Sequence, residues 1–139
     1  MRWASPPPED AKAYGAVSQA YALPKETDAQ RRARTEQIQR ALVVATEVPL
    51  GTAMVAADVI QLTRRIVDRA NVNVLADLAA ATASARAALE AALISVEANL
   101  SAITDRGCYK EFIERMTAVS WLAAEAERTV AGIRSKLTR

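Results

Sequence analysis

The chain has 139 residues, of which 51% are hydrophobic and only 4% aromatic, and its formal net charge is +2. A chain of this size is expected to form one domain, and a charge so close to balance argues against a nucleic-acid partner or an anionic membrane surface. No uninterrupted apolar run approaches the ~18 residues that span a bilayer, and the single cysteine, Cys108, excludes an intrachain disulfide and a cysteine metal cluster. We therefore expect a reduced, cytoplasmic protein without a metal site.

The chain opens with a segment that is expected to stay extended. Three consecutive prolines before Glu9 favour an extended backbone, so residues 1–8 are expected to form a poorly ordered tail. The remainder, 9–139, is expected to be a single helical domain. Its first helix is predicted to run from about residue 9 to residue 22, because Pro24 disfavours helical geometry at the residue before it.

Two further helices are predicted in the first half of the chain. The second starts after Thr27 or Asp28, either of which can cap it, and reaches about Thr46. Pro49 is expected to break or kink the chain, because proline lacks the N–H that a helix interior requires. A third helix follows and ends at the asparagine-rich turn that begins at Asn71. Along one face it carries Val55, Val59, Leu62 and Ile66.

The second half is predicted to form two long helices joined by a turn at 104–107. The first spans about 75–103, with a seam formed by Leu78, Thr82, Ala85, Leu89, Leu93, Val96, Leu100 and Ile103. The second has a seam formed by Phe112, Met116, Val119, Ala123, Ala126, Val130, Ile133 and Leu137. Steps of three and four in such narrow seams favour antiparallel packing at a small crossing angle. With no convincing strand, the sequence predicts an all-α antiparallel bundle of about five helices.

A dimer or larger oligomer is expected from the surfaces that remain. The long alanine-rich helix has a second small-residue surface in addition to its seam, formed by Ala79, Ala83, Ala87 and Ala91. Two apolar surfaces on one small domain need more cover than a single copy offers. We therefore expect association with another copy of the chain.

Histidine is absent, so proton transfer would have to come from carboxylates, lysine or tyrosine. Asp10 and Asp77 are candidates, and both lie near the start of a predicted helix. At such positions a carboxylate also serves simply to cap the helix or to interact with its dipole. Tyr14 lies one turn after Asp10 and shares its face.

Other polar residues are candidates for binding. Lys25 and Arg34 belong to a basic stretch around the start of the second helix, which by itself is typical of a solvated face. Asn99 is a poor helix former in the middle of a helix, so it needs a polar partner. Glu47 lies beside Pro49, and a proline inside a helix frees a carbonyl at a kink, which often lines a pocket although a mere kink is commoner.

Five segments together carry a family resemblance: Glu9–Tyr14, Tyr21–Thr27, Glu47–Leu50, Asn71–Asp77 and Asn99–Asp105. In this order and at these spacings they closely resemble the C-terminal two-thirds of the cyclodeaminase/cyclohydrolase family. That family includes the cyclodeaminase domain of formimidoyltransferase-cyclodeaminase and the bacterial methenyltetrahydrofolate cyclohydrolases. The resemblance extends over roughly residues 9–137.

The resemblance implies two catalytic carboxylates. Asp10 matches the aspartate before the family's Ala-x-Ala-aromatic motif and would move protons at the imine-like carbon, a role that requires partial burial. Asp77 matches an aspartate that follows an asparagine-rich turn in the family. The family's glycine before that turn and serine before the aspartate are replaced here by Ala70 and Ala76.

The same resemblance implies substrate-binding residues for a reduced folate. Lys25 and Arg34 coincide with basic positions of the family and would hold the glutamate or polyglutamate tail of the substrate. Asn99 matches the asparagine of an Asn-Leu-x-x-Ile pattern. Tyr14 and Glu47 complete the set of substrate-binding candidates.

The implied activity is folate-dependent one-carbon chemistry without a cofactor. One reaction is ring closure of 5-formimidoyltetrahydrofolate to 5,10-methenyltetrahydrofolate with loss of ammonia, and the other is hydrolysis of 5,10-methenyltetrahydrofolate to the 10-formyl form. The residues do not choose between the two. The rival hypothesis is a non-catalytic helical oligomerisation module derived from the family, which the substitutions Ala70 and Ala76 and the lack of histidine favour.

Family members begin with about two more helices and a Pro-Gly-Gly-Gly-Ser turn that lines the pocket. The sequence before Asp10 contains no such turn. Three explanations stay open: a fragment of a longer product, a mis-assigned start, or a shortened relative that kept the bundle. A bundle without these helices would expose apolar faces, which favours association with another copy or with the missing half.

Overall fold

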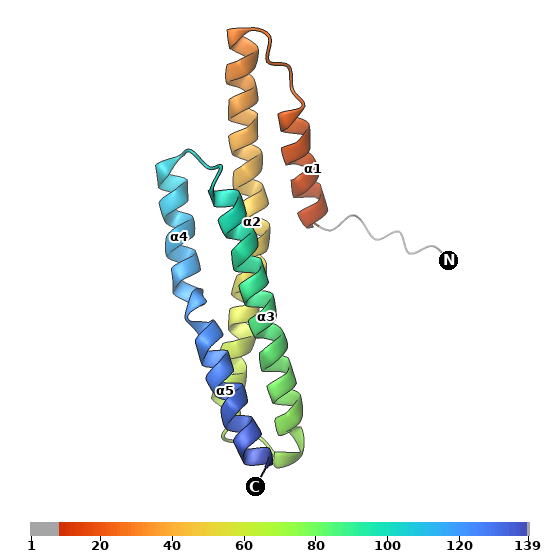
Figure 1. Ribbon diagram of the computed structural model, residues 1–139, viewed down its shortest axis with the longest axis vertical. Coiled ribbons are helices and arrows are strands. Elements are labelled where there is room, and N and C mark those ends of the chain that lie inside the picture. The colour runs from red at the N-terminus through yellow and green to blue at the C-terminus, as the bar shows by residue number, and fades with distance from the viewer. Residues whose placement is uncertain (1–8, 139) are drawn as a thin grey trace, which may run out of the picture.

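The computed structural model describes residues 9–138, which form an elongated bundle of helices (Figure 1). Its elements in chain order are α1 (Glu9–Tyr21), α2 (Asp28–Ile66), the short 3-10 helix η1 (Val72–Val74), α3 (Leu75–Leu100), α4 (Arg106–Ser120) and α5 (Leu122–Leu137). Only Trp121 separates α4 from α5, so this part of the chain consists of four helical rods. The predicted all-α antiparallel class is confirmed, and the proposed tail lies outside the described residues.

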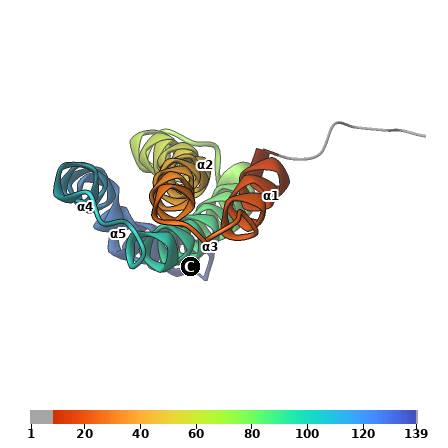
Figure 2. The same ribbon diagram turned by 90° about the horizontal axis from the view of Figure 1, so that it is seen from above.

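The antiparallel pair of α2 and α3 forms the centre of the bundle. Both α4 and α5 pack against this pair, and α1 packs against α2. Seen from above, α1 lies on one side of the pair and the rod of α4 and α5 lies on the other (Figure 2). Since α1 has 13 residues and α2 has 39, α1 runs beside only the N-terminal half of α2 (Figure 1).

The core face of α3 is the one that its sequence predicts. Thr82, Ala85, Leu89, Leu93 and Val96 are buried, as are the last two seam positions, Leu100 and Ile103, and only Leu78 is half-buried. The helix itself ends at Leu100, three residues earlier than expected. The prediction succeeds because α3 packs between α2 and α5, so a period near 3.5 identifies the face that is buried.

The predicted apolar face of the C-terminal half of α2 is not its buried face. Val55 is 65% exposed and Leu62 is 56% exposed, and Val59 and Ile66 are also exposed. The buried face consists instead of Ala53, Ala56, Ala57, Ile60 and Thr63. Apart from Ile60, the residues of this buried face are small, and the larger valine and leucine side chains lie on the exposed face.

The last helix is also less regular than predicted. It is interrupted at Trp121, whose indole N–H donates to the Ala118 carbonyl at 3.0 Å. The interruption changes the buried positions, so that Leu122 is fully buried although it lies outside the predicted seam, whereas Leu137 is 47% exposed. A straight helix drifts relative to a strict seven-residue repeat, and a short break restores contact with the bundle.

The start of α2 follows the predicted capping. Thr27 is the N-cap, its Oγ1 accepts from the Gln30 N–H at 3.2 Å, and Gln30 Oε1 accepts from the Thr27 N–H at 3.1 Å. This reciprocal capping box satisfies backbone donors that no helical carbonyl can reach. The loop between α1 and α2 therefore leads directly into a well-defined helix start.

Contrary to expectation, α2 does not break at Pro49 but continues to Ile66. Proline has no N–H, so the carbonyl of Ala45, one turn earlier, loses its helical donor. The Asn99 side chain on α3 supplies a replacement, because its Nδ2 donates to the Ala45 carbonyl oxygen at 3.1 Å. This bond from the neighbouring helix offsets the defect in α2 and ties α2 to α3 at the same point.

Two helical stretches are long and apolar enough, by length and composition, to cross a membrane: α2 and Val72–Leu100. Each of these stretches also contains charged residues, so neither is an uninterrupted apolar run. About 44% of the most apolar segment of α2 and 33% of that of the second stretch are buried inside the bundle. Helices in the core of a helical bundle meet the same criterion of length and composition.

The pairing of Pro49 with Asn99 predicts a specific coupling. Asn99→Ala should lower the free energy of unfolding by about 1–3 kcal/mol, because the Ala45 carbonyl is then left without a donor. In a Pro49→Ala background the same change should cost clearly less, because the new N–H at position 49 bonds to that carbonyl. Urea unfolding of the four proteins measures the coupling.

Gln39 provides the matched control for this cycle. Its side chain also bridges to the end of α3, donating to the Ala102 carbonyl at 3.0 Å and accepting from the Thr104 N–H at 2.9 Å. Gln39→Ala should cost the same with or without Pro49, since neither bond involves the proline gap. An equal cost of Asn99→Ala in both backgrounds would contradict the interpretation.

Candidate functional site

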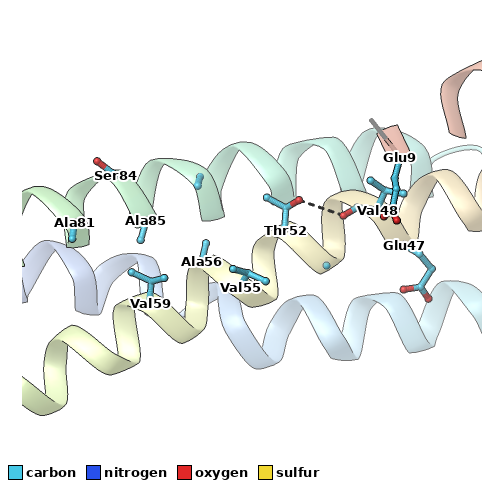
Figure 3. A pocket seen from close by; sticks show the side chains of 12 residues that line it. Glu9, Glu47, Val48, Thr52, Val55, Ala56, Val59, Ala81, Ser84 and Ala85 are labelled. Atoms are coloured by element: carbon cyan, nitrogen blue, oxygen red, sulfur yellow. Dashed lines mark hydrogen bonds between the residues drawn. The ribbon is translucent and has the colours of Figure 1, made fainter. Parts of the chain in front are cut away.

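A groove runs between α2 and α3 along the half of α2 that α1 does not cover (Figure 3). We call it the α2–α3 groove, and its volume is about 850 Å³. Its lining comes from Glu9 at the start of α1, from one face of α2 and from one face of α3. The lining residues are Glu9, Glu47, Val48, Gly51, Thr52, Val55, Ala56, Val59, Ala81, Ser84, Ala85 and Ala88.

A smaller cavity of about 340 Å³ adjoins this groove and contains Asp10. The two share Val48, Thr52 and Ala88, so they form one continuous depression. We call the smaller cavity the Asp10 end, and it is lined by Asp10, Val48, Pro49, Thr52, Ala88, Ala91, Ala92 and Ser95. The structure therefore brings the first predicted catalytic carboxylate next to the proline of α2.

The depression exists because the facing residues are small. Alanine and serine at positions 81, 84, 88, 91 and 95 follow steps of three and four along α3. This spacing places them on one face of the helix, where they leave space that larger side chains would fill. Sequence reasoning assigned no function to Ser84, Ser95 or Thr52, although this spacing was a readable signal.

The hydroxyl groups at the Asp10 end are anchored to their own helices. Thr52 Oγ1 donates to the Val48 carbonyl at 3.4 Å (Figure 3), and Ser95 Oγ donates to the Ala91 carbonyl at 3.2 Å. Once its proton is used in this way, each hydroxyl oxygen keeps lone pairs that can accept from a ligand donor. The Asp10 end thus presents one carboxylate and two acceptor hydroxyls on an otherwise apolar surface.

Asp10 itself is exposed and lies in the first turn of α1. Tyr14, one turn later, is 74% exposed. The partial burial that the catalytic role requires is not provided by residues 9–138. An additional layer over this end would have to supply it.

Within this chain the two predicted catalytic carboxylates, Asp10 and Asp77, do not lie next to each other. Asp77 is exposed in the first turn of α3, one turn before Ala81 at the far end of the groove. Ala88 borders the Asp10 end and lies 11 residues after Asp77 on α3. This separation corresponds to a helical rise of about 16 Å. Asp10 and Asp77 therefore lie toward opposite ends of the same face.

Glu47 contributes to a salt bridge as well as to the groove wall. Its two carboxylate oxygens accept from Nη1 and Nη2 of Arg115 on α4 at 2.7 and 2.9 Å. The side chain extends toward α4 (Figure 3), and this hydrogen bonding raises the pKa of Arg115. A bidentate pair of this kind joins α2 to α4 and reduces the capacity of Glu47 to bind a ligand.

The two basic candidates lie at the other end of α1 from Asp10. The Arg34 guanidinium donates to the Tyr21 carbonyl from Nε at 3.3 Å and from Nη2 at 3.0 Å, and it lies over the Tyr21 ring at 5.5 Å. These contacts satisfy the C-terminus of α1. The Lys25 side chain is exposed, while its carbonyl accepts from Arg31 at 3.0 Å.

Asn99 contacts the backbone of α2, as described above, rather than opening freely into the groove. Within residues 9–138 no three His, Cys, Asp or Glu side chains are grouped so that they could hold a metal ion. Of the seven predicted residues, Asp10 lines the smaller cavity and Glu47 lines the main groove. Arg34 and Asn99 make structural contacts.

Comparison with known proteins gives consistent matches. The sequence model of the formiminotransferase-cyclodeaminase family matches residues 6–118. A methenyltetrahydrofolate cyclohydrolase from Methylorubrum extorquens strain AM1 is 38% identical over 133 residues, which cover 93% of this chain and 62% of that protein.

A solved structure is also similar. The crystal structure of formiminotetrahydrofolate cyclodeaminase from Thermotoga maritima superposes with a TM-score of 0.78 at 21% identity, covering 94% of this chain and 61% of that one. At this identity the likeness concerns the fold. The chain spans less than two thirds of the length of each of these two proteins.

The bidentate contact predicts that Glu47 and Arg115 act as a pair. Glu47→Gln and Arg115→Met should each destabilise the protein slightly, and a double-mutant cycle in urea should give a coupling of about 0.2–1 kcal/mol because both groups are partly exposed. Zero coupling would contradict the pairing of these two residues.

Proposed function

The chain belongs to the formiminotransferase-cyclodeaminase family, and we propose that it acts on a reduced folate as a methenyltetrahydrofolate cyclohydrolase. The observation that carries this proposal is the 38% identity with the cyclohydrolase from Methylorubrum extorquens over nearly the whole chain. The position of Asp10 beside a largely apolar depression supports it, since hydrolysis needs a group that accepts a proton.

The proposed reaction needs one proton acceptor and a site that orients the substrate. Water adds to the carbon that bridges N5 and N10 of 5,10-methenyltetrahydrofolate, and Asp10 accepts a proton from that water. The bond between the carbon and N5 then breaks, and N5 keeps the electron pair and takes up the remaining hydroxyl proton as the formyl C=O forms. The product 10-formyltetrahydrofolate is released, and the proton that Asp10 accepted passes to solvent. The substrate cation supplies the electrophile, so no metal or redox cofactor is part of the proposal.

The Asp10 end suits the flat ring system of a folate. Its volume of about 340 Å³ lies within the range of small-molecule sites, and its walls are mainly apolar. Thr52 and Ser95 offer hydroxyl oxygens to ring N–H groups. In this proposal Lys25 meets the glutamate tail, while Arg34 and Asn99 act by holding α1 and α2 in place.

A second reaction of the same class is ring closure of 5-formimidoyltetrahydrofolate with loss of ammonia. The name of the family and the fold shared with the Thermotoga cyclodeaminase favour it. The methenyl absorbance distinguishes the two activities. It falls when 5,10-methenyltetrahydrofolate is hydrolysed, and it rises when the formimidoyl compound is converted.

The rival from another class is a non-catalytic assembly module. The exposure of Asp10 and the alanines at positions 70 and 76 favour this alternative. We propose in addition that the protein is cytoplasmic and works as a homodimer or larger oligomer. An oligomer would supply the cover that Asp10 lacks within residues 9–138.

Asp10→Asn tests the proposed catalytic role. The variant should lose turnover by about 10²–10⁴-fold while its folate affinity stays within a small factor, because asparagine keeps the shape but cannot accept the proton. Asp28→Asn is the matched control, since it changes an aspartate in the first turn of α2, far from the groove. It should leave turnover unchanged.

Thermal melting of the same two variants separates catalysis from capping. If Asp10 only stabilises the start of α1, asparagine will serve nearly as well and turnover will not change. Calorimetry with 5-formyltetrahydrofolate tests binding independently. A folded, helical protein that releases no heat at millimolar folate would contradict the proposed function and favour the assembly module.

A further inference from the structure

A separate cavity lies between α1 and α2, and the proposed reaction does not use it. We call it the α1–α2 cavity, and its volume is about 560 Å³. Ala16 and Ala20 are part of its lining, and their short side chains leave space between the two helices. The polar side chains that reach it are Gln19, Gln37 and Arg40.

The α1–α2 cavity continues the line of the α2–α3 groove along one face of α2. Val44 lines the cavity and Val48 lines the groove, and these two residues lie one turn apart on the same face. On α1, Glu9 lines the groove and Ala16 lines the cavity, two turns further along the same face. Since α1 runs beside α2 in the opposite direction (Figure 1), a long ligand bound at the Asp10 end can continue along α1 into the cavity.

The charges along this path are separated by sign. Glu9 and Asp10 lie at one end, and neither takes part in the salt bridges formed within residues 9–138. The residues that line the groove and the Asp10 end include no lysine or arginine. At the other end, Arg40 lines the cavity, and the exposed Lys12 lies one turn before Ala16 on the same face of α1.

A reduced folate carries the same separation of charge. In 5,10-methenyltetrahydrofolate the bridge between N5 and N10 is cationic, the aminobenzoyl group is neutral, and the glutamate at the far end is anionic. With the cationic bridge beside Asp10, electrostatic attraction directs the glutamate toward Arg40. The neutral aminobenzoyl group then passes the carboxylate of Glu9.

On the basis of the proposed function, we propose that the α1–α2 cavity binds the aminobenzoylglutamate tail of the folate, and we call it the tail subsite. Arg40 binds a carboxylate of the first glutamate, because a guanidinium holds a carboxylate by charge-assisted hydrogen bonds. Val44 is 56% exposed and offers apolar surface to the benzoyl ring. The Gln37 side chain can both donate to and accept from the amide of the tail.

The lengths agree with this placement. Arg40 precedes Val48 by eight residues, which is about 12 Å along α2. From N10 to the glutamate α-carbon an extended tail spans about 8 Å by ordinary covalent bond lengths, and the long arginine side chain covers the remaining distance. Lys25 lies beyond the end of α1, which itself extends about 16 Å from Asp10 to Tyr21. Lys25 is therefore placed to meet a later glutamate of a polyglutamate tail rather than the first.

One carboxylate of the chain competes for Arg40. Glu36 lies one turn earlier on α2, and its Oε2 is 3.8 Å from Nη2 of Arg40, which is too long for a hydrogen bond. Both side chains are more than two-thirds exposed, so this pair is weak. Arg40 can therefore turn from Glu36 to a ligand at little cost.

Calorimetry with two stable ligands tests the tail subsite. 5-Formyltetrahydrofolate carries one glutamate, whereas 5-formyltetrahydropteroate lacks it. The unmodified protein should bind the folate about tenfold more tightly than the pteroate. Arg40→Gln should remove most of this difference by weakening folate binding alone. Arg32→Gln is the matched control, since it removes the same charge from α2 without lining the cavity, and it should leave both affinities unchanged.

Two further measurements separate ligand binding from a structural role of Arg40. Glu36→Gln should tighten folate binding, because it removes the competing carboxylate. In steady-state assays with 5,10-methenyltetrahydrofolate, Arg40→Gln should raise KM and leave kcat unchanged, because the glutamate lies away from the reacting carbon. Circular dichroism should show the same helicity in all variants.

The outcomes distinguish the tail subsite from the proposed function. Equal affinities of the unmodified protein for the folate and the pteroate would overturn the tail subsite and leave the proposed function standing. An equal loss of affinity for both ligands in Arg40→Gln would do the same. Binding of neither ligand by a folded protein would overturn both.

Discussion

The architecture depends on carrying α2 through a proline without losing its contact with α3. Pro49 leaves the Ala45 carbonyl without its helical donor, and Asn99 bonds to that carbonyl from 54 residues away. This bond gives the Ala45 carbonyl a donor, and it also fixes the position of α3 along α2. Everything that faces the groove, from Val48 to Ser95, is placed relative to this contact.

The position of the candidate site follows from that constraint. Pro49 lines the Asp10 end, and Asn99 lies one turn beyond Ser95 on α3. The structural defect and the proposed chemistry therefore share one region of the molecule. Beside this region, Glu47 is held by Arg115, which joins α2 to α4. Arg34 holds the other end of α1, away from Asp10.

Sequence reasoning predicted those features that depend on local pattern. The capping of α2 by Thr27, the seam of α3 and the start of α1 at Glu9 can all be read from neighbouring residues, and the structure has them. The resemblance carried by five short segments likewise led to a family that the comparison with known proteins confirms. Asp10 borders the smaller cavity but is exposed, so its catalytic role stays a prediction.

What could not be predicted depends on residues distant in sequence. The continuity of α2 needed a donor from α3, and the partner of Glu47 lies 68 residues away. Ala53, Ala57 and Ile60 are buried in the bundle, whereas Val55 is left on the wall of the open groove between α2 and α3. A periodic pattern identifies an apolar face, but it does not tell which of two faces an unseen neighbour covers.

NMR mapping of the proposed folate site is the most direct test of the proposed function. Titration of the labelled protein with 5-formyltetrahydrofolate should shift the amide resonances of Asp10, Thr52, Ala88 and Ser95 most, since these residues line the Asp10 end. Resonances of α4 and the second half of α5 should stay unchanged. Shifts confined to α4 and α5, or no shift at millimolar ligand, would contradict the placement of the site between α2 and α3.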